Sequence, residues 1–69
     1  MSQRREGVVE SYDSQEGLGW IVGAGERYRF HCAELVDGTR EVDPGTLVRF
    51  TVAHRFGHIE AAEIEKFVG

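Results

Sequence analysis

Short apolar runs separated by polar, glycine-rich segments dominate the chain. Apolar residues rarely recur at helical spacing for more than one turn, whereas alternation of apolar and polar residues, typical of half-buried strands, is clear. In the third run, Tyr28 and Phe30 alternate with Arg27, Arg29 and His31, so two arginines and a histidine are expected on one surface. The pattern predicts five short strands over residues 7–12, 18–22, 27–32, 47–52 and 59–67.

The segments between these runs carry residues that turns favour. The segments 13–17 and 23–26 are polar or glycine-rich, and Asp43-Pro44-Gly45 precedes the fourth strand. A single helical turn is expected over 33–36 and a hairpin over 54–57. The inward positions of the strands predict a core made mostly of Val9, Ile21, Tyr28, Phe30, Val48, Phe50 and Ile59, with Ala61 and Ile64 also facing inward.

The length of 69 residues predicts one small domain over residues 1–69, with a core of about 7–66 and frayed ends at 1–5 and 66–69. This length excludes two-domain enzymes, α/β barrels and Rossmann folds. Five short strands cannot build a sandwich of two sheets of the usual size, but they can close into a small barrel without exposed edges. The pattern alone leaves two architectures open, an OB-like and an SH3-like barrel.

Charge and hydropathy narrow the classes of partner. The chain has 8 basic and 12 acidic residues, a formal net charge of −4, which argues against strong non-specific binding to nucleic acid. The local field around a site matters more than this total. No apolar run approaches the ~20 residues of a membrane span, and the N-terminus has no apolar segment typical of a signal peptide. We therefore expect a cytoplasmic protein without a membrane partner.

Several blocks of the sequence resemble a bacterial cold-shock domain. That family opens with G-x-V-x-W-F-N followed by K-G-F-G-F-I, and it carries a later V-F-V-H-F motif and a closing A-A-N-V. The matching blocks, in order, are GVVESYDSQEGLGWI at 7–21, YRFHC at 28–32, GTREV at 38–42 with Gly45, and AAEI at 61–64. The resemblance is to small, divergent members, and it implies an all-β, five-stranded antiparallel OB-fold barrel.

The resemblance also implies binding of single-stranded RNA or DNA, of RNA-chaperone or regulatory type, by bases stacking on aromatic side chains. No catalytic residue, cofactor or metal site is expected. Alternation supports an outward Trp20, because Ile21 beside it is the better core residue. The candidate nucleic-acid-binding residues are Tyr12, Leu18, Trp20, Arg29, His31, Arg40 and Arg55.

Several positions depart from the family pattern. Ser11, Arg29, Cys32 and Thr39 stand where the family has aromatic residues, and Glu10 and Glu16 stand where it usually has lysine. Losing about four stacking groups at ~1 kcal/mol each would weaken binding roughly a thousandfold. A guanidinium at position 29 can compensate in part, because it stacks on bases and neutralises phosphate.

These departures keep a second hypothesis open, a barrel that has lost nucleic-acid binding. Such a barrel would instead bind another protein, or a second copy of itself as a homodimer. An enzyme is not expected. His31 and Cys32 cannot form a nucleophile dyad on a strand, since adjacent residues face opposite ways, and Cys32 is expected to be a small buried hydrophobic residue.

Overall fold

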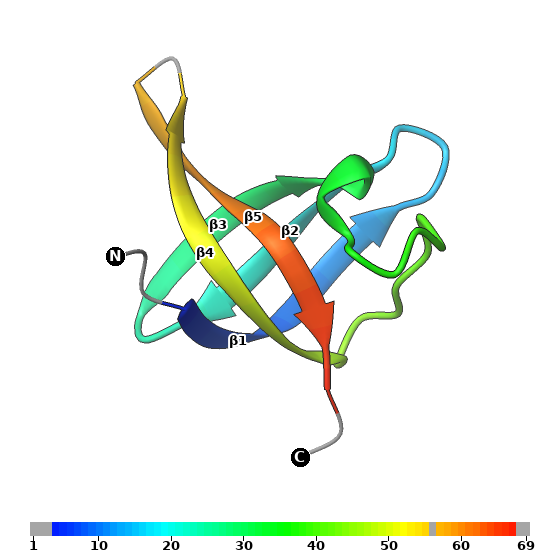
Figure 1. Ribbon diagram of the computed structural model, residues 1–69, viewed down its shortest axis with the longest axis horizontal. Coiled ribbons are helices and arrows are strands. Elements are labelled where there is room, and N and C mark those ends of the chain that lie inside the picture. Colours follow the sequence, from blue (N-terminus) through cyan, green and yellow to red (C-terminus); the bar gives the residue numbers. More distant parts are fainter. Residues whose placement is uncertain (1–3, 56, 68–69) are drawn as a thin grey trace.

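Five strands form a sheet that closes on itself in the order β1-β2-β3-β5-β4, with β4 returning to β1 (Figure 1). The computed structural model describes residues 4–55 and 57–67. Neighbouring strands are antiparallel except β3 and β5, which close the barrel in parallel. The elements are β1 (Arg4–Asp13), β2 (Leu18–Gly23), β3 (Glu26–His31), the 3₁₀ turn η1 (Cys32–Glu34), β4 (Leu47–Arg55) and β5 (His58–Lys66).

The predicted all-β barrel is confirmed, with corrections at the ends of the strands. β1 begins at Arg4 rather than at residue 7, because Arg4 and Arg5 pair with Thr51 and Phe50 of β4. The expected fraying of residues 1–5 is therefore wrong for Arg4 and Arg5. The expected fraying of 66–69 is wrong for Lys66, which pairs with Val48 at the end of β5. Residues 1–3, 68 and 69 lie outside the described part. β4 continues to Arg55, so the β4–β5 hairpin is longer than expected. No helix in the described residues is long and apolar enough to cross a membrane.

The barrel interior holds most of the predicted core. Buried side chains at or below 2% exposure include Val9, Ile21, Tyr28, Phe30, Val48, Phe50, Ala61 and Ile64. Ile59 is a correction: it lies near the hairpin end of β5, is only partly buried, and packs against the edge of the core. Leu35 and Val42, which follow no strand pattern, are also buried.

A bulge in β5 explains why alternation fails there. Arg49 pairs with Glu65 and Thr51 with Ala62, so β5 contains one residue more than β4 over this stretch. Glu63 takes up the extra length at a φ of 50°. Ala62 is consequently buried like Ala61, and its carbonyl accepts a hydrogen bond from the buried Thr51 hydroxyl at 3.2 Å.

A second bulge, in β1, changes which side chains face outward. Val9 pairs with Ile21 and Ser11 with Trp20, so Glu10 is the extra residue on β1. Without it, Ser11 would share the inward face of Val9. With it, Ser11 joins the outer face opposite Trp20, and the following residue, Tyr12, turns toward the core.

We predict that Phe30→Ala lowers the free energy of unfolding by about 3–5 kcal/mol, because the ring is fully buried and its removal leaves a cavity. Urea unfolding followed by circular dichroism measures this loss. The matched control is Val36→Ala, at a side chain that is 59% exposed, with an expected change of less than about 0.5 kcal/mol. Equal effects of the two substitutions would contradict the burial described here.

Candidate nucleic-acid interface

The pairing of β2 with β3 gathers four predicted site residues on one outer surface. Trp20 pairs with Arg29, and Leu18 pairs with His31. Directly opposed residues share a face of the sheet, and the alternate position Ile21 is fully buried. The predicted outward orientation of Trp20 is thus confirmed, with the side chain partly exposed. We call the outer surface formed by these four residues the β2–β3 face.

Gly19 allows this surface to lie close over the core. A Cβ at this position would lie 2.6 Å from Cζ of the Phe30 ring and 2.6 Å from the carbonyl oxygen of Ser11. Both distances are far below van der Waals contact, so any side chain would push β2 away from β1 or displace Phe30. The glycine between Leu18 and Trp20 therefore lets the backbone that carries both outer residues pack directly on Phe30.

Two arginines of β3 contact the Trp20 ring. Cζ of Arg27 lies 4.5 Å from the ring centroid, and Cζ of Arg29 lies 5.9 Å from it. Arg27 is held by Glu10, whose Oε1 accepts from Nη2 at 2.8 Å and from Nε at 3.1 Å. Glu10, which stands where the cold-shock family usually has lysine, is thus paired with Arg27. The β1 bulge that places it there has no sequence signal.

A hollow of about 360 Å³ lies beside Trp20 at the ends of β1 and β2. It has room for a nucleobase and is open to solvent. Arg27, which lies over the Trp20 ring, is not among the residues that surround the hollow. The lining residues are Ser11, Tyr12, Asp13, Glu16, Leu18, Gly19, Trp20 and Arg29.

A second hollow of similar volume adjoins the first, and it contains His31 and Arg55 together with Leu18 and Arg29. His31 is exposed. Arg55 reaches this site from β4, although its strand was expected to end at residue 52. Its guanidinium lies 3.7 Å from carboxylate oxygens of both Glu34 and Glu60, so its charge is largely offset.

Tyr12 has a different environment from the other predicted site residues. Its ring lies parallel to Phe30, with centroids 5.8 Å apart, and its hydroxyl donates to the Arg40 carbonyl at 2.6 Å. Partial burial raises the pKa of the phenol, and the nearby Cys32 and Glu41 raise it further. The hydroxyl thus stays protonated and keeps the loop after η1 attached. Cys32 starts η1 and is half-buried rather than fully buried.

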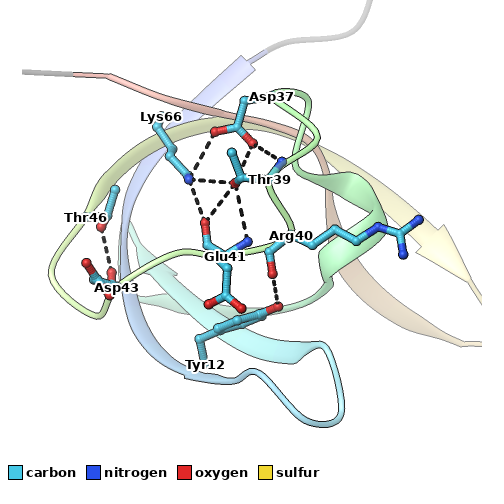
Figure 2. Close-up of polar contacts among 8 residues, drawn as sticks. All are labelled: Tyr12, Asp37, Thr39, Arg40, Glu41, Asp43, Thr46 and Lys66. Carbon is cyan, nitrogen blue, oxygen red and sulfur yellow. Dashed lines mark hydrogen bonds and ion pairs between the residues drawn. The ribbon is translucent and has the colours of Figure 1, made fainter.

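Lys66 fastens the same loop from the other side (Figure 2). Its Nζ donates to the Glu41 carbonyl at 2.6 Å and to Thr39 Oγ1 at 3.1 Å, and it lies 3.0 Å from Asp37 Oδ2. Asp37 Oδ1 accepts from the backbone N–H of Thr39 at 3.0 Å. We call this hydrogen-bonded cluster of Asp37, Thr39, Glu41 and Lys66 the clasp. Thr39, which stands where the family has a loop aromatic, is therefore part of it. The Arg40 side chain extends away from it (Figure 2).

Ion pairing leaves few cations available near the β2–β3 face. Among the described residues, Arg27 and Arg55 pair with carboxylates, whereas Arg29 and Arg40 have no carboxylate within 4.0 Å. Of these two, only Arg29 touches the tryptophan. The unpaired positive charge of the surface is accordingly concentrated beside Trp20.

Comparison with known proteins supports the fold. Neither a family model nor a curated protein matches the sequence. Among solved structures, Drosophila Unr CSD456 superposes with a TM-score of 0.81 and 29% sequence identity, over 96% of this chain. The chain has a cold-shock-domain-like OB fold. The SH3-like alternative is thereby set aside. The cold-shock-like chain corresponds to 27% of the Unr chain, and OB folds as a class include many that bind oligonucleotides.

We predict that Asp37→Asn destabilises the barrel at neutral pH and has no effect in strong acid. The N–H of Thr39 and the ammonium of Lys66 hold the pKa of Asp37 below the usual 3.8. A lowered pKa in the folded state adds stability above pH 3.8, and this stability is lost as the pH falls through the folded pKa. Asparagine keeps an acceptor for Thr39 but loses the charge.

Urea midpoints of the two proteins measured from pH 7 down to pH 2 test this expectation. The difference between wild type and Asp37→Asn should be constant near neutrality and should shrink below pH 4. Glu26→Gln, which removes an exposed carboxylate at the start of β3, serves as the control. A difference that persists at pH 2 would show that the clasp does not depend on the charge of Asp37.

Proposed function

We propose that this cold-shock-like barrel binds single-stranded RNA or DNA through the β2–β3 face, in an RNA-chaperone or regulatory role. The observation that carries the proposal is the partly exposed Trp20, flanked by Arg29 and adjoining a hollow with room for a base. Base stacking on an aromatic ring contributes about 1–3 kcal/mol per base and tolerates many sequences. A guanidinium beside the ring adds charge for the adjoining phosphate.

The remaining site residues take graded roles in this proposal. Leu18 and His31 extend the surface along the strands, while Arg40 and Arg55 are rim cations that could reach phosphates at the edges. Tyr12 borders the first hollow and holds the loop that carries Arg40. Binding is weak, micromolar or weaker at physiological salt, because Ser11 and Thr39 offer no rings and Arg27 and Arg55 are already paired with carboxylates.

We predict that Trp20→Ala removes most of the binding, because the only large ring of the face is lost. The measurement is fluorescence anisotropy of a labelled pyrimidine-rich or mixed heptamer, which does not depend on the tryptophan. Leu47→Ala, at a side chain that is 38% exposed on β4, is the control and should leave the affinity unchanged. Retained affinity in Trp20→Ala would place the site elsewhere or remove nucleic acid from consideration.

We predict a shallow dependence on salt, with a slope of log affinity against log salt on the order of −1 to −2, since few phosphates are neutralised. Arg29→Ala should weaken binding and flatten this slope. Arg49→Ala removes the same charge from β4, where Arg49 pairs with Glu6 and contacts Phe67, and should change both quantities less. Equal effects of the two variants would mean that only the net charge matters.

A protein partner is the second candidate, and the carboxylates paired with Arg27 and Arg55 favour it. Nuclear magnetic resonance distinguishes the two. If millimolar oligonucleotide of any sequence leaves the amides of β2 and β3 unshifted, the nucleic-acid proposal is wrong and a protein-binding or self-associating module takes its place.

A further inference from the structure

The hollow beside Trp20 is lined by residues with acceptor groups as well as by aromatic residues. On the side of the β1–β2 turn it is lined by Ser11, Asp13 and Glu16, and on the side of β3 by Arg29. A ligand stacked on Trp20 would thus have carboxylates along one edge and a guanidinium along another. This arrangement bears on which base the site accepts.

Asp13 is held in place by the turn that follows it. Its Oδ1 accepts from the backbone N–H of Gln15 at 2.9 Å and of Glu16 at 3.2 Å, the pattern of an Asx turn. Both recorded bonds end on the same oxygen, so the orientation of the whole carboxylate is set. Glu16 belongs to the same turn and is exposed at the border of the hollow.

Ionised carboxylates only accept hydrogen bonds, and the bases differ in what they offer them. Adenine, cytosine and guanine carry an exocyclic amino group, a donor, next to a ring nitrogen or carbonyl. Uracil and thymine offer a single ring donor, N3–H, which lies between two carbonyl oxygens, so a carboxylate that accepts from it faces an acceptor on either side and is held less well than by an amino group. A phosphate would be repelled from this edge, so the backbone must run on the side of Arg29.

We propose that the hollow selects a base with an exocyclic amino group over uracil or thymine. Asp13 and Glu16 accept from the amino group, and Arg29 donates to a carbonyl or ring nitrogen of the same base or to its phosphate. The selection rests on the proposed function, because it requires that a base stacks on Trp20. It assigns a specificity role to two carboxylates that would otherwise only weaken binding.

The test compares four RNA heptamers, one of uridine alone and three in which the central nucleotide is adenosine, cytidine or guanosine. Titration of the full chain is followed by Trp20 fluorescence. We expect the heptamers with a central amino-bearing base to bind about fivefold to tenfold more tightly than the uridine heptamer, the discrimination of one modest side chain–base pairing.

Asp13→Asn and Glu16→Gln, singly and together, identify the groups responsible. Asparagine can still accept the two N–H groups of the turn, so the fold is kept. Removing negative charge strengthens binding of every oligonucleotide, and the informative quantity is therefore the ratio of affinities. This ratio should fall toward one in the double variant. Glu26→Gln removes the same charge at the opposite end of β3 and should leave the ratio unchanged.

The outcomes separate this inference from the function on which it rests. Binding of all four heptamers with equal affinity, or a preference for uridine, overturns the selection and leaves nucleic-acid binding intact. A preference that survives the double variant also overturns it, because other groups then read the base. No binding of any heptamer at millimolar concentration overturns both the selection and the proposed function.

Discussion

The alternation of side chains along β2 is the constraint on which the surface depends. Ile21 fills the barrel centre with no exposure, so its neighbour Trp20 must lie outside. Pairing with β3 then determines which residues meet the ring. A slip of one residue would bury Trp20 and expose Ile21. The strand register that fills the core is therefore also the one that exposes the candidate site. Gly19 permits no other spacing, because Phe30 lies directly beneath it.

Charge pairing gives the face a different character from a uniformly basic surface. The net charge of −4 is not spread evenly, since most cations are each held by a carboxylate. Arg27 lies over the Trp20 ring while it is paired with Glu10. This contact therefore supports the ring without adding net charge to the surface. Arg29 is left with its charge available at the same ring. The surface therefore attracts anions only weakly over long distances. Discrimination between ligands then depends on the positions of its side chains rather than on its net charge.

Much of the fold followed from pattern and resemblance, and the failures have physical causes. The strands, the barrel and the outward Trp20 were predictable because alternation has a period of two. Glu10 and Glu63 break this period as bulge residues, and neither differs from an ordinary exposed glutamate in the sequence. The bulge at Glu10 is why Tyr12 packs on Phe30. Val42 was missed because a single apolar residue in a loop has no period.

Site contacts were harder to predict than site positions. Trp20 and Arg29 could be paired from the strand register, but the partners of Lys66 and one partner of Arg55 lie far away along the chain. Arg55, for example, meets Glu34 of η1 as well as Glu60 of the same hairpin. Such pairs depend on how the strands close around the barrel, and no local spacing encodes them.

The extent of backbone pairing between neighbouring strands differs around the barrel. β3 and β5 share one paired position, Arg29 with Glu60, whereas every other neighbouring pair of strands runs together over several. Opening along this line breaks the least backbone hydrogen bonding, and the line passes beneath the second hollow, between Arg29 and Glu60. On gradual heating, β3 and β5 would therefore separate first, at the candidate binding surface. The antiparallel strand pairs would stay together longer. The candidate binding surface therefore lies over the two strands that separate most easily.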